Sequence, residues 1–238
     1  MTFHNVHGDE DLVNSVTKLL NLQGVHLTIG YDFRVFRELL KQHFPDRKLG
    51  MMFDPDSHEL NDGSAFWIIG QTQDGEIIHT QAMRILKTGP RNLADFMTKR
   101  FDEFAPAGME LDMERSSYRV GPGASRMSGR IAYCGEYWIG GKPGQFRGTG
   151  LSYILSRYVW WQTLQHWDPD HIISIIAQGT AMKGFVERAS MMHTEPNAVS
   201  MCAVGSEKPV SGYLCYLHRE DLHYLLDIPL KTALLEAA

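Results

Sequence analysis

The chain has 238 residues, of which 43% are hydrophobic and 21% are charged, a composition typical of a soluble globular protein with one large core. Its formal charge is -5 at pH 7 and it has no basic tract, which argues against a nucleic-acid partner and means that local groups must hold any anionic ligand. Its three cysteines, Cys134, Cys202 and Cys215, are far apart, and no secretion signal or bilayer-length apolar run is present. We therefore expect a cytoplasmic protein with free thiols and no membrane insertion.

The first half of the chain mixes helical and extended patterns. In order, we expect a helix after the acidic residues 9–11, a strand at 25–30, a helix that ends at Pro45, a polar loop at 46–64, a hairpin of 65–71 with 76–86, and a helix at 92–104. The hairpin prediction depends on Asp74-Gly75, which lies between two apolar runs and favours a tight turn.

The second half starts with the less regular stretch 109–120 and then has clearer signals. These predict an extended stretch at 128–140, a helix at 149–167, a strand at 171–178, a short helix at 180–189, and strands at 198–204 and 212–217. The order predicts a mixed α/β (α+β) fold in a single domain, 1–238, with a helical extension at 1–24 and a helical tail at 218–238.

The most informative segment connects the extended stretch to the long helix through glycines. It reads Gly140-Gly141-Lys142-Pro143-Gly144-Gln145-Phe146-Arg147-Gly148-Thr149-Gly150. Glycines allow positive φ and bring backbone N–H groups close to a ligand, and a helix N-terminus favours anions. A pyrophosphate is the anion that such a turn suits, with Arg147 adding a charged hydrogen bond. An ordinary strand-to-helix connection is the alternative, because glycine is common there.

Residues 145–150 match the acyl-CoA signature Gln/Arg-x-x-Gly-x-Gly/Ala of the GNAT acyltransferases, at the junction where that family has it. The element order over residues 25–217 resembles the family as well. The resemblance implies a GNAT-like fold, with a central mixed, mostly antiparallel sheet flanked by helices. It further implies that the loop binds the CoA pyrophosphate and that the preceding strand splays from its neighbour to pair with pantetheine. The cofactor-binding candidates are then Ile139, Gln145, Phe146, Arg147, Gly148, Thr149 and Gly150.

The N-terminal half is similar to the acyl-homoserine-lactone synthases in three segments, residues 33–36, 65–69 and 88–96. Asp112-Met113-Glu114-Arg115 is similar to their Glu-x-x-Arg element, with Asp in place of Glu. Their acidic Glu-x-Asp-x-x-Asp stretch is echoed only by Asp54-Pro55-Asp56. This resemblance implies a long acyl group, taken from CoA or from an acyl carrier protein.

Acylation of an amine needs a base for the nitrogen and an acid for the leaving thiolate. Glu136 lies on the strand before the loop, where the GNAT family often has its base; an exposed strand glutamate is the alternative. Asp112 and Glu114 are the next candidates. The family's acidic tyrosine has no counterpart, because Phe185 and Val186 occupy that region, and Ser190 or Tyr213 are substitutes.

The sequence thus predicts an acyltransferase that uses acyl-CoA, acetyl-CoA included, as co-substrate and passes the acyl group directly to a small-molecule amine. An acyl-homoserine-lactone or N-acyl amino acid synthase and a non-catalytic acyl-CoA-binding module are the alternatives. His166, Asp168, Asp170 and His171 crowd one turn without fixing a ligand set, so we expect no metal. The sequence leaves open whether the chain forms a homodimer.

Overall fold

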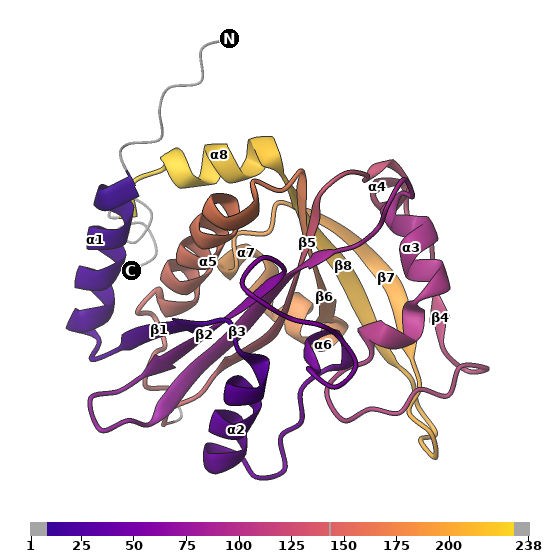
Figure 1. The fold of residues 1–238 in the computed structure, drawn as a ribbon, viewed down its shortest axis with the longest axis horizontal. Helices are drawn as coiled ribbons and strands as arrows, with labels where there is room; N and C mark the ends of the chain where they lie inside the picture. Colours follow the sequence, from indigo (N-terminus) through magenta and orange to yellow (C-terminus); the bar gives the residue numbers. More distant parts are fainter. Residues whose placement is uncertain (1–8, 143, 231–238) are drawn as a thin grey trace.

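The computed structural model describes residues 9–142 and 144–230. Within them, eight strands form one sheet in the order β1-β2-β3-β5-β6-β8-β7-β4 (Figure 1). The strands are β1 His26–Gly30, β2 Ala65–Gln71, β3 Ile77–Leu86, β4 Ser117–Tyr118, β5 Ile131–Ile139, β6 His171–Ala177, β7 His193–Met201 and β8 Val210–His218. Among their pairings only β5 with β6 is parallel. The expected mixed, mostly antiparallel sheet flanked by helices is confirmed.

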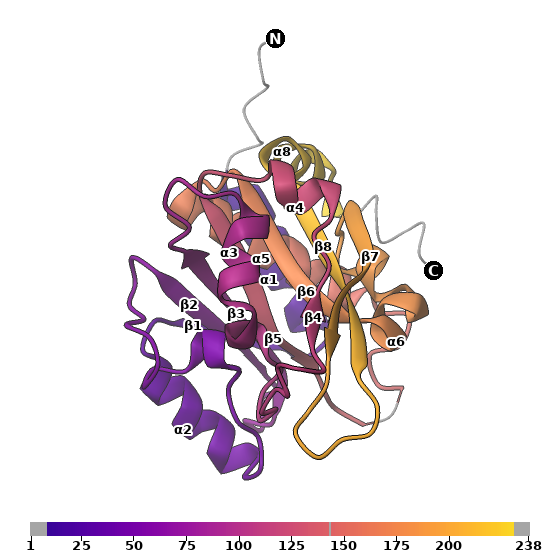
Figure 2. The ribbon, with the colours of Figure 1, turned by 90° about the vertical axis from the view of Figure 1, so that its right-hand side faces the viewer.

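Helices cover both faces of the sheet (Figures 1 and 2). The helical segments are α1 Asp9–Leu22, α2 Phe33–His43, η1 Met51–Phe53, α3 Leu93–Lys99, η2 Phe101–Phe104, α4 Pro122–Arg126, α5 Leu151–Trp167, α6 Gln178–Thr180, η3 Ala181–Phe185, α7 Val186–Arg188 and α8 Arg219–Asp227. Side chains of α2, η1, α3 and η2 pack on one face, which we call the α2 face. Those of α1, α5 and α8 pack on the opposite face, the α5 face.

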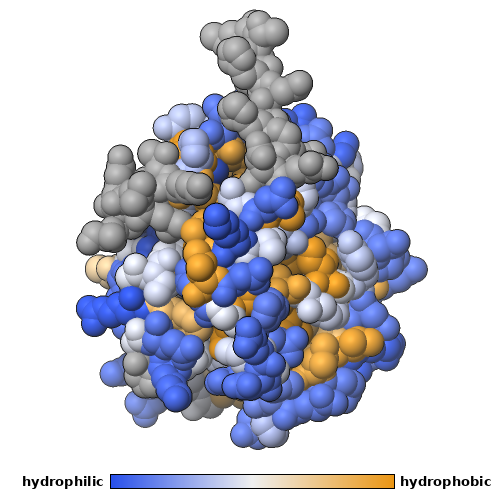
Figure 3. Space-filling model, turned by 90° about the vertical axis from the view of Figure 1, so that its left-hand side faces the viewer, coloured by the Kyte–Doolittle hydropathy of each residue, from blue (hydrophilic) through white to orange (hydrophobic). Residues whose placement is uncertain are grey.

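The chain's patterning explains these layers. Asp32 starts α2 by accepting hydrogen bonds from the backbone of Arg34 and Val35, and the apolar spacing then buries Phe33, Phe36 and Leu40 against the sheet. Helix α5 is apolar on most sides because α1, α8 and the sheet surround it. Figure 3 shows the side of the molecule opposite to that in Figure 2, where hydrophobic residues lie in patches between hydrophilic ones. Large apolar side chains of the layers, such as those of Phe36, Phe66 and Trp160, are at most 1% exposed.

The helical extension expected at 1–24 is packed into the domain rather than separate from it. Val16 and Leu20 of α1 are buried against Ile154 and Leu155 of α5. The expected C-terminal tail includes α8, while residues 231–238 and residues 1–8 lie outside the described part of the chain. The three cysteines are buried, and none forms a disulfide in the described structure. None of the described helices is long and apolar enough to cross a membrane.

Several expected boundaries were wrong for local reasons. The helix expected at 92–104 breaks at Arg100, whose backbone is not helical, and resumes as η2. The helix expected at 180–189 is interrupted at Lys183 and Gly184, whose backbones are not helical and of which Gly184 has φ +75°. Strand β7 begins at residue 193 rather than 198, with a register shift between Glu195 and Val199, and the short α4 was not expected at all.

Candidate active site

The parallel strands β5 and β6 separate part-way along their length. Their pairing ends at Cys134 with Ser174, whereas β5 continues to Ile139 and β6 to Ala177. Beyond that point the facing backbone edges have no ladder partner in each other. The splayed strand that the GNAT resemblance implies is therefore present.

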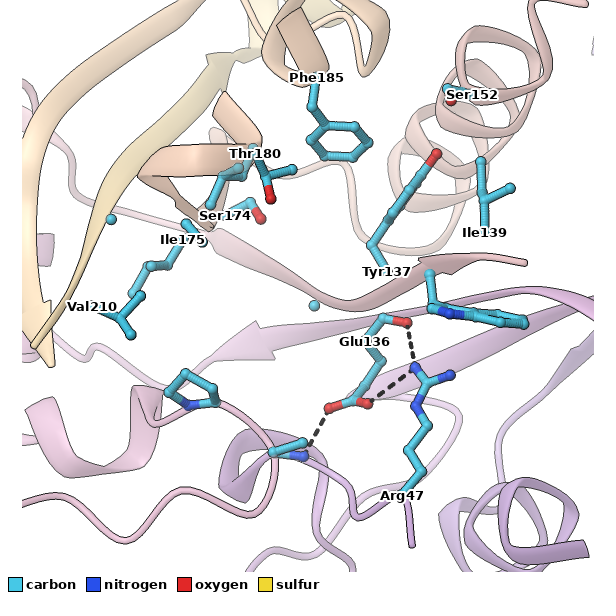
Figure 4. A pocket seen from close by; sticks show the side chains of 18 of the residues that line it. Arg47, Glu136, Tyr137, Ile139, Ser152, Ser174, Ile175, Thr180, Phe185 and Val210 are labelled. Carbon is cyan, nitrogen blue, oxygen red and sulfur yellow. Dashed lines mark hydrogen bonds and ion pairs between the residues drawn. The ribbon is translucent and has the colours of Figure 1, made fainter. Parts of the chain in front are cut away.

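A cavity of about 1020 Å³ passes through this split. On the α2 face it is lined by Arg47, Phe53, Phe104, Tyr133 and Glu136. On the α5 face it reaches the glycine-rich loop, the first turn of α5 and Phe185 (Figure 4). One opening thus connects the two faces of the sheet at the end of β5.

The glycine-rich loop forms a compact turn in which part of the backbone is already bonded. The Arg147 N–H donates to the Gly144 carbonyl at 3.1 Å, and the Thr149 N–H donates to the Phe146 carbonyl at 3.4 Å. The Gln145 side-chain oxygen accepts from the Lys142 N–H at 2.9 Å. Within the loop expected to bind a pyrophosphate, the amides of Arg147 and Thr149 are therefore used by the turn itself.

The backbone N–H groups that the turn does not use lie at the N-terminus of α5. Gly148 and Gly150 have φ +75° and +70°, and no acceptor for the N–H groups of Gly148, Gly150, Ser152 or Tyr153 exists among the described residues. The first N–H groups of a helix lack intrahelical acceptors, so they attract anions. An anion bound at the N-terminus of α5 would lie near the cations Lys142 and Arg147, which line the cavity.

Gln145, Phe146, Arg147 and Ile139 line the cavity together, whereas Gly148, Thr149 and Gly150 shape the turn behind it. The Thr149 hydroxyl is used within the turn, where it donates to the Phe146 carbonyl and accepts from the Leu151 N–H. The loop therefore presents free backbone amides and, in Lys142 and Arg147, two cations on the same side of the cavity.

Glu136 reaches the cavity through a β-bulge. Thr80 of β3 lies opposite Trp138 and Ala82 lies opposite Gly135, so β5 has one residue more than β3 over this interval. Glu136 takes φ +53°, which is unusual for a side chain with a Cβ. The bulge interrupts the alternation of the strand: Glu136 joins the α2 face, and Tyr137 turns to the α5 face.

Two groups from the segment after α2 hold the Glu136 carboxylate. The Gly50 N–H donates to Oε1 at 2.7 Å, and Arg47 Nη2 lies 3.8 Å from Oε2 (Figure 4). The Glu136 side chain is only 7% exposed. Burial raises the pKa of this carboxyl above its ordinary value, against the lowering effects of the Gly50 amide and Arg47. The alternative of an exposed strand glutamate is thus wrong.

The Arg47 guanidinium is held between rings and oxygens. It lies 5.6 Å from the Trp138 ring centre and 5.7 Å from that of Phe44. Nη2 donates to the Thr80 hydroxyl at 2.8 Å and to the Glu136 carbonyl at 3.3 Å. Burial lowers the pKa of Arg47, and Glu136 opposes that change. Sequence reasoning missed this residue because it lies in a stretch that reads as a polar loop.

The other acid and base candidates are not brought to the cavity. The Asp112 carboxylate accepts from the N–H groups of Glu114 and Arg115 in a tight turn, and neither Asp112 nor Glu114 lines the cavity. Ser190 and Tyr213 do not line it either. Within residues 9–142 and 144–230, no three His, Cys, Asp or Glu side chains converge as metal ligands.

Tyr137 is a lining residue that sequence reasoning also missed. Its ring centre lies 4.7 Å from that of Phe185, and its buried hydroxyl points toward α5 near Ser152 and Ser156 (Figure 4). Burial raises the pKa of Tyr137, against lowering interactions with the two serines. Tyr137 therefore forms a wall of the cavity on the α5 face.

No protein-family model matches this chain, and no protein of curated function matches it. Similar solved structures include an N-acetyltransferase from Staphylococcus aureus Mu50, with 8% identity, coverage of 82% of this chain and 98% of the other, and a TM-score of 0.44. The AHL synthase LasI has 16% identity, coverage of 80% and 89%, and a TM-score of 0.43. Arabidopsis thaliana NAA60, in complex with acetyl-CoA, has 12% identity, coverage of 82% and 98%, and a TM-score of 0.45.

Both groups that the sequence resembles, N-acetyltransferases and acyl-homoserine-lactone synthases, thus occur among similar solved structures. With TM-scores below 0.5 these likenesses are too distant to assign an activity. The chemistry has to be argued from the chain's own cavity, loop and charged residues.

Proposed function

We propose that this protein is an acyltransferase that moves an acyl group from acyl-CoA directly to the amine of a small molecule. The observation that carries the proposal is the cavity through the β5–β6 split. It connects an anion-binding loop on one face of the sheet with a buried carboxylate on the other. A donor and an acceptor that enter from opposite faces would meet at the end of β5.

The chain's groups fit a CoA thioester in three respects. The amides of Gly148 and Gly150 and the first turn of α5, with Lys142 and Arg147, suit a pyrophosphate. The unpaired edges of β5 and β6 beyond Cys134 and Ser174 offer backbone partners to the amides of an extended pantetheine arm. The opening between these edges leads to the α2 face, so the thioester carbonyl would approach Glu136.

Glu136 is the base in this proposal. The carboxylate takes a proton from the acceptor's ammonium group, and the freed nitrogen attacks the thioester carbon. A C–N bond forms, the C–S bond breaks, and the electron pair leaves with sulfur as thiolate. The nitrogen passes its second proton to this thiolate, directly or through solvent, which gives the amide and the free CoA thiol. Glu136 then releases the proton that it took to solvent. Because burial raises the pKa of Glu136, the carboxylate is a stronger base than an exposed glutamate.

The walls of the cavity favour a donor with a long acyl chain. Phe53, Phe104, Tyr133 and Val199 line its α2 side, and the first three belong to a continuous aromatic cluster with ring centres 5.7 Å and 5.3 Å apart. Apolar walls stabilise a hydrocarbon chain by about 0.8 kcal/mol per buried methylene. This observation supports the lipid-like N-acyl products implied by the resemblance to acyl-homoserine-lactone synthases.

The test is release of free thiol from acyl-CoAs of graded length, measured with a broad panel of small amines. We expect amine-dependent thiol release, with kcat/KM rising with chain length until the apolar walls are filled. Thermal shift with the same thioesters supplies a binding readout. Binding without thiol release from any donor would favour the non-catalytic acyl-CoA-binding module, and neither binding nor release would refute the proposal.

A further inference from the structure

We infer that the acceptor carries a carboxylate beside its amine, as an α-amino acid does, and that Arg47 binds this carboxylate. The inference rests on the proposed acyl transfer and names the class of acceptor. It starts from the guanidinium next to the proposed base, 3.8 Å from Glu136 Oε2.

Arg47 has donors left after its protein contacts are counted. Only Nη2 donates to other described residues, namely to Thr80 and to the Glu136 carbonyl. The side chain is 21% exposed and lines the cavity, and the guanidinium has five N–H donors in a planar fork. A planar carboxylate is the group that such a fork binds with two parallel hydrogen bonds.

The charge balance during the reaction points to the same group. On the α2 side, Arg47 and Glu136 are the charged side chains among the described lining residues, whereas Lys142 and Arg147 belong to the loop. A bare ammonium that approaches Glu136 also approaches Arg47, and the two like charges repel at this burial. An acceptor with an adjacent carboxylate removes that repulsion, because each of its charges meets one of opposite sign.

Proton transfer strengthens the argument. Once Glu136 has taken the proton it is neutral, and Arg47 is left as a half-buried cation with no anionic partner among the cavity residues. Isolating a buried charge in this way is costly. A carboxylate on the acceptor keeps Arg47 paired before and after the transfer, so an amino acid is acylated with less electrostatic cost than a simple amine.

Arg47 is held rigidly by its neighbours, which suits a residue that selects acceptors by their carboxylate. The guanidinium lies over both the Phe44 and the Trp138 ring, 5.7 Å and 5.6 Å from their centres. These two rings pack edge-on against each other at 4.8 Å, and the guanidinium also donates a hydrogen bond to Thr80 on β3. Such support fixes the fork before any ligand binds, which favours affinity and selectivity.

The experiment compares three acceptors that share one side chain: an α-amino acid, its amide and its decarboxylated amine. We expect the wild type to have a kcat/KM for the amino acid about 10- to 100-fold above that for either analogue, the range expected for a charged hydrogen-bonded contact. Arg47→Gln should remove this preference, and Arg47→Lys should retain part of it. Arg34→Gln, at an exposed arginine of α2, is the matched control and should leave the preference unchanged.

A titration with products separates this inference from the proposed function, because it needs no turnover. The wild type should bind the N-acyl amino acid at least 10-fold more tightly than its amide. Arg47→Gln should bind the acid and the amide with the same weak affinity. Equal binding of acid and amide to the wild type would overturn the inference, even if amines are acylated. A selective loss for the acid in Arg47→Gln would support it even if no tested donor is turned over.

Discussion

The two sides of the split differ in how they are built. The loop side consists of consecutive residues: a turn of glycines, two cations and the first amides of α5. The α2 side is assembled from distant segments, since Glu136 comes from β5, Arg47 and Gly50 follow α2, and Thr80 comes from β3. In the proposed function, the first side would hold the ligand mainly through backbone N–H groups whose positions the turn glycines set. The second depends on three side-chain contacts that must coexist.

Changing Glu136 should have the largest effect and tests the α2 side directly. Glu136→Gln keeps the shape and the contact with the Gly50 amide but cannot accept a proton, so kcat should fall by about 10²- to 10⁴-fold. Because burial raises the pKa of Glu136, the wild-type rate should rise with pH above the ordinary glutamate range, and this acidic limb should disappear in the variant. Steady-state rates between pH 4 and 9 measure both.

Asp112→Asn is the control for that prediction. Asp112 lies in a turn and does not line the cavity, so its rate and pH profile should match the wild type. A variant Glu136→Gln that retains the wild-type rate and acidic limb would rule out Glu136 as the base.

Changing Gly148 tests the loop side. Gly148→Glu adds a carboxylate beside the free amides and forces a side chain into φ +75°, so CoA-dependent thermal stabilisation should be lost. Gly89→Glu is a matched control, because Gly89 has φ +62° with open space around its Cβ position but lies between β3 and α3, outside the glycine-rich loop. Both apo proteins should lose similar stability, but only the first should lose the response to CoA. An unchanged response in Gly148→Glu would exclude this loop as the CoA site.

The difference between the contiguous loop side and the α2 side, which is built from distant segments, explains which features the sequence predicted. The glycine-rich loop, most of the strands and helices in their order along the chain, and the long helix were predictable, because their signals are contiguous: turn glycines, alternation and helical spacing. The cage around Glu136 was not, because Arg47 and Gly50 lie in a polar stretch with no periodicity. One signal was present: Gly135 interrupts an otherwise bulky strand, and glycine within a strand often marks a bulge or a close contact. Inward-pointing amides at residues 147 and 149 could not be predicted from glycine content.

His79 connects the bulge to the pH dependence of stability on the α5 face. Its Nδ1 lies 2.9 Å from the Trp138 carbonyl, which can only accept, so Nδ1 carries the proton. Burial lowers the pKa of His79 to about 4. Below about pH 6.5 the imidazole of the unfolded chain takes up a second proton, on Nε2, and becomes charged, whereas the buried imidazole of the folded chain does so only near pH 4. Stability therefore falls as pH drops from about 6.5 to 4, by on the order of 3 kcal/mol.

His79→Asn should flatten this dependence, because asparagine can donate to the same carbonyl without titrating. Urea unfolding at pH 7 and at pH 4.5 measures the difference. His26→Asn is the control, at an exposed histidine of β1. If the loss of stability between the two pH values is equal in the wild type and His79→Asn, another group causes it.

Gly135→Ala should have the smallest effect and tests how closely the α2 side is packed. A Cβ at Gly135 would lie 2.6 Å from a ring carbon of Phe53, whose ring stacks on Phe33 and Tyr133 and has little room to move. We expect a loss of about 1–3 kcal/mol in the free energy of unfolding, the range for overpacked cores. Gly63→Ala, with a single ordinary contact at 3.4 Å, should stay within about 0.5 kcal/mol of the wild type.

Combining Gly135→Ala with Phe53→Ala should cost less than the sum of the two single changes, because the smaller residue makes room for the methyl group. Additive losses would mean that the Phe53 ring is not what opposes a methyl group at position 135.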